Sequence, residues 1–328
     1  MRVLVIGAAG MLGRKLTAAL IARGTLNGEA IDSLALADIG KPEAPDFAGT
    51  VETLAADLSE PGAADRLVAS RPDVIFHLAA IVSGEAEADF EKGYRVNLDG
   101  TRTLFEAIRK AGGQDFYCPR LVFTSSIVVF GEPLPEVIAD THCLTPLTSY
   151  GTQKAMCELL LADYSRRNFL DGVGIRLPTI SIRPGKPNMA ASGFFSSILR
   201  EPLVGQEAVL PVSDTVRHWF ASPRAAVEFM LHAAELDSAE LGSQRTITMP
   251  GLSATVGDQI EALRRVAGDQ AASLIRREPN PIIANIIAGW PRSFDARRAE
   301  ALGFRAEGSF DEIIRVHIED ELAGAVSV

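Results

Sequence analysis

Tyr150 and Lys154 stand four residues apart in the segment SYGTQK. On a helix this spacing places both side chains on one face, about one turn apart. A phenol normally loses its proton near pH ~10, and a nearby ammonium group favours the phenolate. We therefore expect Lys154 to lower the pKa of Tyr150, so that the phenol can exchange a proton with a substrate hydroxyl. Such pairs also occur by chance on solvated helix surfaces, so the surrounding sequence must decide between the two interpretations.

A serine hydroxyl could hold the same substrate oxygen in place. The apolar run 120–123 predicts a strand, and it ends in Thr124, Ser125 and Ser126. Either serine follows the strand directly. The residues alone do not decide whether Ser125 or Ser126 holds the substrate oxygen.

The chain begins with a phosphate-binding pattern. The apolar run Arg2–Ile6 is typical of a strand buried on both faces of a parallel sheet. Gly7, Gly10 and Gly13 follow with the spacing G-x-x-G-x-x-G, and a helix with leucines on one stripe comes next. Glycines let the backbone approach a pyrophosphate, and the helix N-terminus directs amide groups at it. The alternative is a tight turn that only allows close helix packing.

The next two predicted strands end in acidic residues. Asp38 follows the apolar run 34–37, where a carboxylate can accept hydrogen bonds from both ribose hydroxyls of adenosine and repel a 2′-phosphate. The sequence therefore favours NAD over NADP. Asp57 and Leu58, after the run 51–56, could flank the adenine.

The run 74–80 ends in small residues that leave room for a cofactor backbone. We expect His77, inside this run, to be a core histidine and not a catalyst. Ser83 lies just beyond the end of this strand. It is either a substrate contact or a loop residue without a functional role. Asn97, in the helical stretch 89–110, could anchor backbone or water near a nicotinamide.

Strand-like runs alternate with helical ones up to residue 184, which predicts an α/β fold with a Rossmann-like, doubly wound parallel sheet. We expect residues 1–184 to form an NAD-binding domain, with a returning strand near 245–249. Residues 185–328 would form a smaller, mostly helical substrate-binding cap. The segment 216–220 reads as mixed, before a helix over 223–236.

Composition excludes several other classes of protein. The 328 residues carry a net charge of -10 and no Lys/Arg-rich run, which argues against nucleic acid as a partner. No apolar run approaches the ~20 residues that span a bilayer. The 3 cysteines form no Cys-x-x-Cys pair, and the 5 histidines lack metal-ligand spacing. We expect reduced thiols, a cytoplasmic protein and no metal.

The ordered set of motifs resembles the extended short-chain dehydrogenase/reductase family, which includes NDP-sugar epimerases and dehydratases, over nearly the whole chain. The resemblance implies that Tyr150 is the acid/base, that Lys154 contacts the nicotinamide ribose, and that Ser126 orients the substrate oxygen. It also implies a homodimer, because relatives commonly pair through the helices around Asn97 and Tyr150. The residues expected to bind NAD are Gly7, Gly10, Met11, Leu12, Gly13, Asp38, Asp57, Leu58, Leu78, Ala79, Ala80, Asn97, Tyr150, Lys154 and Pro178.

Two departures narrow the choice within this family. The dehydratases carry an Asp-Glu pair after the strand-end serine or threonine, whereas this chain has Ile127 and Val128, and neither can carry a proton. A dehydratase of that kind is therefore not expected. Around Arg217 the family often reads Arg-Asp-Phe, but this chain reads Arg-His-Trp. That difference puts the usual nucleotide-sugar contacts in doubt.

The stretch from Tyr150 to residue 219 resembles one branch of the family, the D-erythronate dehydrogenases, which use NAD to oxidise the 2-hydroxyl of a small sugar acid. For the substrate we expect contacts from Ser83, Ser126, Tyr150, Asn188 and Arg217. Arg217 is the candidate for the carboxylate, although a surface or interdomain ion pair would explain it equally well. Two other functions stay open. One is an NDP-sugar epimerase that recycles its NAD, and the other is a dinucleotide-sensing protein without turnover.

Overall fold

The computed structural model describes residues 1–113, 115–185 and 192–326, and the chain divides into two compact units. Unit 1 comprises Met1–Val129, Thr148–Arg176 and Val227–Ile247, and unit 2 comprises Phe130–Leu147, Leu177–Ala226 and Thr248–Val328. Each unit contains three separate stretches of chain. The predicted first domain, residues 1–184 with a returning strand near 245–249, stays a prediction.

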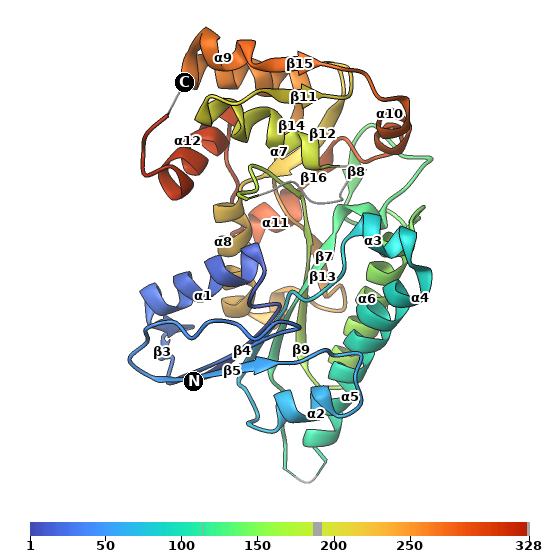
Figure 1. The fold of residues 1–328 in the computed structure, drawn as a ribbon. Coiled ribbons are helices and arrows are strands. Elements are labelled where there is room, and N and C mark those ends of the chain that lie inside the picture. The colour runs from blue at the N-terminus through green and yellow to red at the C-terminus, as the bar shows by residue number, and fades with distance from the viewer. Residues whose placement is uncertain (114, 186–191, 327–328) are drawn as a thin grey trace. The chain divides into compact units, whose positions relative to one another are not determined.

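Unit 1 is built on a seven-stranded sheet with the order β13-β9-β7-β6-β1-β4-β5 (Figure 1). β1 pairs in parallel with β4 on one side and with β6 on the other, and the pairs β4/β5 and β6/β7 are also parallel. The strand order reverses at β1, so the predicted doubly wound, Rossmann-like fold is confirmed. Ligands of such sheets bind at this reversal, beyond the carboxyl ends of the strands. The strands are β1 (Arg2–Ile6), β4 (Ser33–Asp38), β5 (Thr50–Ala55), β6 (Val74–His77), β7 (Arg120–Ser126), β9 (Asp171–Leu177) and β13 (Thr246–Thr248).

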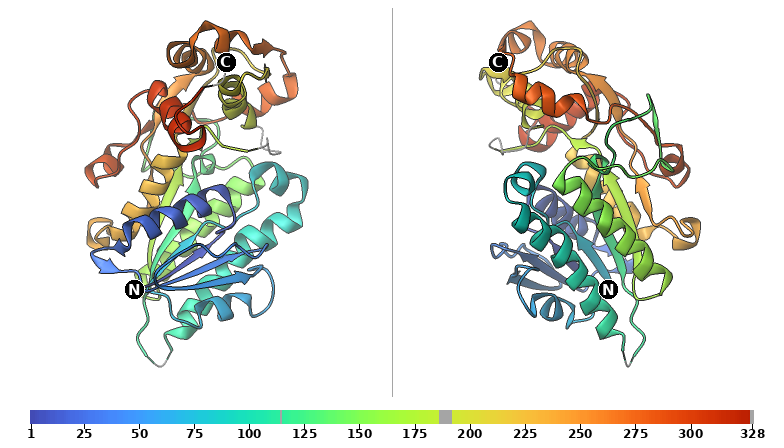
Figure 2. Two further views of the ribbon diagram at one scale, coloured as in Figure 1. Left: turned by 60° about the vertical axis from the view of Figure 1, so that its left-hand side comes forward. Right: turned by 90° about the vertical axis from the view of Figure 1, so that its right-hand side faces the viewer.

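Helices cover both faces of this sheet. Figure 2 shows α1 (Met11–Arg23) on one face and α5 (Gly100–Ala111) and α6 (Ser149–Arg166) on the other. Phe105 and Leu104 of α5 and Leu161 of α6 are buried in one apolar cluster with side chains of the sheet. The predicted helix over 89–110 is interrupted by a π-helical turn, and residues 25–30 form a short hairpin. The remaining elements are β2 (Thr25–Leu26), β3 (Glu29–Ala30), α2 (Ala63–Val68), α3 (Ser83–Ala88), α4 (Phe90–Gly93), the π-helical turn Tyr94–Asp99, the 3-10 turns Ile127–Val129 and Ser238–Glu240, and α8 (Pro223–Glu235).

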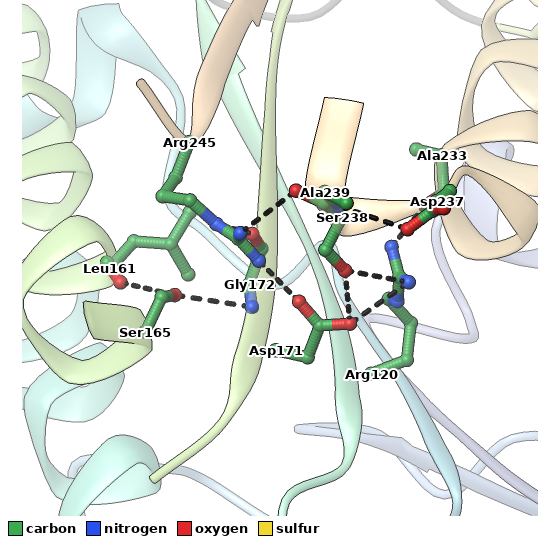
Figure 3. A network of polar contacts seen from close by, with 10 residues as sticks. All are labelled: Arg120, Leu161, Ser165, Asp171, Gly172, Ala233, Asp237, Ser238, Ala239 and Arg245. Carbon is green, nitrogen blue, oxygen red and sulfur yellow. Dashed lines mark hydrogen bonds and ion pairs between the residues drawn. The ribbon is translucent and has the colours of Figure 1, made fainter. Parts of the chain in front are cut away.

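A polar network anchors the returning strand β13 to the sheet (Figure 3). At the start of β9, the Asp171 carboxylate pairs with Arg120 at 2.9 Å and with Arg245. The Ser238 hydroxyl donates to the same carboxylate, and Arg245 Nε donates to the carbonyl of Gly172 at 2.8 Å. These half-buried contacts attach the segment before β13 to β9 and β7.

Unit 2 combines helices with short strands around its own apolar core. That core contains Phe195, Phe220, Leu263 and Ile314, all fully buried. The segment that read as mixed is strand β12 (Arg217–Ala221), which pairs antiparallel with β14 (Leu252–Thr255). The other elements are β8 (Ile138–Ala139), β10 (Thr179–Ile180), α7 (Gly193–Arg200), the 3-10 turn Pro202–Val204, β11 (Ala208–Leu210), α9 (Val256–Ser273), β15 (Ile275–Arg277), α10 (Pro281–Ala288), β16 (Phe294–Asp295), α11 (Arg297–Ala301) and α12 (Phe310–Glu321).

None of the helices in the part of the chain that the structure describes is both long and apolar enough to cross a membrane.

His77 lies in the core of unit 1, as the sequence predicted. Its Nε2 is 2.9 Å from Thr101 Oγ1, and that hydroxyl already donates to the carbonyl of Asn97. The Thr101 hydroxyl has one hydrogen, so Nε2 is the donor in this contact. Burial, with a smaller contribution from the charge of Lys154, lowers the pKa of His77 from 6.5 to about 3.

This lowered pKa predicts a loss of stability in acid. Between pH 6.5 and about 3 the unfolded chain binds a proton at His77 that the folded chain does not, so the free energy of unfolding falls as the pH falls. The contribution is about 1.4 kcal/mol per pH unit. In urea titrations over this pH range, the free energy of unfolding of His77→Asn should fall less steeply with pH than that of the wild type. An equally steep fall in the variant would contradict a neutral, buried His77.

Candidate active site

The glycine loop lies between β1 and α1 at the carboxyl edge of the sheet. The amides of Gly7 and Ala8 donate to the carbonyl of Ala37 at 2.8 and 3.1 Å. Gly7 has a φ of +95°, and a Cβ there would lie 2.8 Å from the backbone nitrogen of Ala79. Gly10 is the N-cap of α1 and contributes no side-chain cap. The first amides of α1 are therefore directed at the space beyond the strand, as a pyrophosphate site requires.

Asp38 lies at the tip of β4, next to this loop. Its Oδ2 accepts a hydrogen bond from the amide of Ala9 at 2.9 Å, and its Oδ1 accepts one from the amide of Ile39 at 2.7 Å. Two backbone amides hold the carboxylate in place. Its orientation is therefore fixed, while lone pairs remain for ribose hydroxyls.

A cavity of about 390 Å³ opens at this edge of unit 1. The volume is in the range of small-molecule sites. Its walls combine backbone of the glycine loop with small and apolar side chains from the ends of four strands. The lining residues are Ile6, Gly7, Ala9, Gly10, Asp38, Ile39, Ala56, Asp57, Leu58, Leu78, Ala79, Ala80, Ile81 and Val96.

The structure thus brings together the predicted residues Gly7, Gly10, Asp38, Asp57, Leu58, Leu78, Ala79 and Ala80 on one cavity. Met11, Leu12 and Gly13 follow in the first turn of α1. Pro178 is buried between β9 and β10, in unit 2. The sequence did not indicate Ala9, Ile39, Ala56, Ile81 or Val96, because their apolar side chains carry no chemical signal and only the fold assigns them to the wall.

Asn97 is buried in the π-helical turn. Its Oδ1 accepts from the amide of Ile81 at 2.9 Å, and its Nδ2 donates to Gln153 Oε1 at 2.8 Å. One amide side chain therefore fixes a cavity-lining segment to the helix that carries Tyr150. π-Helical turns occur frequently at functional sites.

α6 places Tyr150 and Lys154 on one face, close to the end of β7. The Lys154 ammonium is buried and donates to the carbonyl of Thr124 at 2.8 Å. It also lies 4.7 Å from the ring centroid of Phe123 and 5.7 Å from that of Tyr150. The ammonium is thus next to the strand end, with the phenol ring beside it.

The predicted effect of Lys154 on Tyr150 is wrong for the protein described here. Burial raises the pKa of Tyr150 to about 12, and Cys157 contributes in the same direction. Burial also lowers the pKa of Lys154 to about 8, against the charges of Cys157 and Glu158. Desolvation penalises the charged form of each group. A phenolate at this site requires further positive charge close to the ring.

The two strand-end serines differ in their partners. Ser125 is buried, and its hydroxyl donates to Glu158 at 2.5 Å. Ser126 is half-buried and accepts a long bond, 3.4 Å, from the amide of Val128. The Ser126 hydroxyl donates to no acceptor among the described residues. It can therefore donate a hydrogen bond to an oxygen atom of a ligand. The next residue, Ile127, is buried and apolar.

The remaining predicted substrate residues belong to different parts of the chain. Ser83 begins α3 and is half-buried. Arg217, in unit 2, is exposed, donates to the carbonyl of Ser253 at 3.0 Å and lies 3.8 Å from Asp258. Asn188 lies outside the described residues. No three His, Cys, Asp or Glu side chains of the described ranges are grouped as metal ligands would be.

A model of the NAD dependent epimerase/dehydratase family matches residues 3–243. The chain belongs to this family. NAD is its cofactor, and its chemistry is the oxidation of a CH–OH carbon.

Two relatives within the epimerase/dehydratase family match almost end to end. A D-erythronate dehydrogenase of Cupriavidus necator is 49% identical over 98% of both chains. One of Haemophilus influenzae is 44% identical over 98% of this chain and 100% of that protein. The predicted family and cofactor are confirmed.

Solved structures agree on the fold. A crystal structure from Agrobacterium tumefaciens, described as a nucleoside-diphosphate-sugar epimerase, is 66% identical, with a TM-score of 0.98 over 99% of this chain and 95% of that one. An L-threonine dehydrogenase from Cupriavidus necator is 22% identical, with a TM-score of 0.83 over 98% of this chain and 99% of that one, and shows the fold alone.

Gly13 provides a test of the glycine loop. A Cβ at Gly13 would lie 2.1 Å from the carbonyl oxygen of Gly7 and 2.7 Å from Ala8 Cα, so Gly13→Ala must displace the loop. We expect the Kd for NAD, measured by calorimetry, to rise roughly tenfold or more. Gly24→Ala, at the other end of α1, is the matched control. Nothing lies within 4 Å of its Cβ, so its φ of +64° should reduce stability but not NAD affinity. Equal Kd values for both variants would contradict the assigned loop.

Proposed function

We propose that this protein is a cytoplasmic, NAD-dependent dehydrogenase that oxidises the 2-hydroxyl of D-erythronate to give 2-dehydro-D-erythronate. The observation that carries the proposal is the 49% and 44% identity, over nearly the full chain, to two proteins named for this activity. The free cysteines at 118, 143 and 157 are consistent with a reducing compartment.

The residues at the end of β7 and on α6 can divide the proton chemistry between them. The Ser126 hydroxyl has a free hydrogen and would hold the substrate oxygen. Tyr150, as the phenolate that remains after its own proton has passed to solvent, would accept the proton of the same hydroxyl as the C2 hydrogen leaves with its electron pair. NAD, when bound, supplies the acceptor for that hydride and a positive charge near the phenol.

Lys154 would stabilise the phenolate once it forms. Its ammonium is fixed by the carbonyl of Thr124, and burial strengthens its field at the ring of Tyr150. Since burial raises the pKa of Tyr150, Lys154 alone does not produce the phenolate. The added positive charge of the oxidised cofactor would complete the conditions for proton transfer.

Contacts to the sugar acid are proposed for Ser83, Ser126, Tyr150, Asn188 and Arg217. The carboxylate needs a donor, and a guanidinium has the matching planar geometry. Arg217 is exposed, and its nearest carboxylate, Asp258, is 3.8 Å away. That ion pair is weak enough to be exchanged for a substrate carboxylate.

A second candidate function is suggested by the description of the 66% identical Agrobacterium tumefaciens structure, an NDP-sugar epimerase. Oxidation of a CH–OH carbon begins both reactions. The epimerase returns the hydride, so it produces no net NADH, whereas the dehydrogenase must release NADH in each turnover. Net NADH formation therefore separates the two activities.

The test is NADH absorbance over a panel of four-carbon sugar acids and UDP-sugars. We expect stoichiometric NADH with D-erythronate. Tyr150→Phe should reduce turnover by roughly 100-fold or more, because it removes the proton acceptor, while NAD binding stays nearly unchanged. Epimerised UDP-sugar without NADH would establish the second function. NAD binding without any turnover would indicate a dinucleotide sensor, and undiminished turnover in Tyr150→Phe would exclude its acid/base role.

We also propose a homodimer that pairs through α6. Leu159, in the middle of this helix, is 68% exposed, and Met156 and Leu160 beside it are half-buried. They form an apolar ridge at helical spacing. A two-fold axis would place this ridge against its own copy.

Leu159→Glu should convert a two-chain particle into a single chain, because it brings like charges together in the buried ridge. Sedimentation equilibrium measures the molar mass. Leu147→Glu is the matched control, since Leu147 is 67% exposed but lies outside α6, and its mass should equal that of the wild type. A wild-type mass of one chain, or a dimeric Leu159→Glu, would rule out this pairing.

A further inference from the structure

A buried carboxylate lies one helical turn beyond Lys154. Glu158 is on the same face of α6 as Tyr150 and Lys154, since the three residues follow at intervals of four. Its side chain is 4% exposed and forms a bidentate ion pair with Arg176 of β9, with Nε 3.0 Å from Oε1 and Nη2 2.8 Å from Oε2. A buried ion pair of this kind requires further hydrogen bonds to offset its desolvation.

One of those hydrogen bonds comes from the catalytic strand end. The Ser125 hydroxyl donates to Glu158 Oε1. Successive side chains of a strand point to opposite faces, so fixing Ser125 towards Glu158 directs Ser126 away from it. The preceding residue, Thr124, presents the carbonyl that accepts the Lys154 ammonium. The Glu158 carboxylate therefore fixes the backbone at the end of β7. The position of the Thr124 carbonyl and the direction of the Ser126 side chain both depend on that backbone.

The same carboxylate acts on Lys154 through its charge. Burial lowers the pKa of Lys154, and the negative charge of Glu158 opposes this effect. Without Glu158, Lys154 and Arg176 would remain as two buried cations that no longer share this carboxylate. The protonated form of Lys154 would lose stability.

We propose that Glu158 is a positioning residue for the reaction, which anchors the end of β7 through Ser125 and keeps Lys154 protonated. This inference rests on the proposed dehydrogenase function. It assigns a role to a residue that touches neither substrate nor cofactor.

Two variants separate the two effects of Glu158, which are its hydrogen bond from Ser125 (the anchor) and its negative charge near Lys154. Glu158→Gln keeps an oxygen that can accept from Ser125 but removes the charge. The alkaline pH at which kcat for oxidation falls to half its maximum should therefore drop by roughly one unit, because losing a buried anion lowers the pKa of Lys154 and the ammonium is lost at lower pH. Ser125→Ala keeps the ion pair and removes the anchor. We expect kcat to fall roughly tenfold, with KM and the pH midpoint near the wild-type values.

Asp171→Asn is the matched control. Asp171 also pairs with buried or half-buried arginines, Arg120 and Arg245, but at the start of β9 (Figure 3). This variant should lower Tm while leaving kcat and the pH midpoint unchanged. If Glu158→Gln is too unstable to purify, Ser125→Ala still tests the anchor.

The wild type is assayed first on the substrate panel. A wild type without turnover counts against the proposed function. An active wild type with an unshifted pH midpoint in Glu158→Gln, or with wild-type kcat in Ser125→Ala, would overturn the positioning role. A pH shift in Asp171→Asn as large as that in Glu158→Gln would also overturn it, because it would reflect general destabilisation.

Discussion

Burial of the Lys154 ammonium is the constraint on which the rest of the site depends. A cation in this position loses its hydration, and its hydrogen bond to the carbonyl of Thr124 replaces only part of it. The aromatic ring of Phe123 and the carboxylate of Glu158 supply the rest of its environment. Each partner comes from a buried strand or helix, so the ammonium cannot move without disturbing the core.

Under the proposed mechanism, the cofactor contributes to the proton chemistry as well as accepting the hydride. In the chain by itself, burial favours the neutral phenol of Tyr150 and disfavours the charged Lys154. Under the proposed mechanism, the protonation of Tyr150 would be linked to the binding of NAD.

The same sheet edge serves dehydrogenases and epimerases, which explains why similar proteins have different names. In the proposed function the glycine loop, Asp38 and the cavity would hold a dinucleotide in either case, and Tyr150 would remove a hydroxyl proton in either case. What differs is the fate of the hydride and the group that the substrate-binding residues recognise. Function within this family is therefore decided by contacts outside the nucleotide cavity.

The sequence by itself determined the fold class, the glycine loop, Asp38 and the Tyr150–Lys154 pair, because each depends on local spacing along one strand, turn or helix. It did not reveal β12, the π-helical turn at Asn97 or the apolar cavity wall, since these depend on pairing between distant segments. The choice between Ser125 and Ser126, and the sign of the pKa shift at Tyr150, were also beyond it. Only the tertiary structure shows that Glu158 binds Ser125 and that burial raises the pKa of Tyr150, because desolvation depends on what surrounds a group in space.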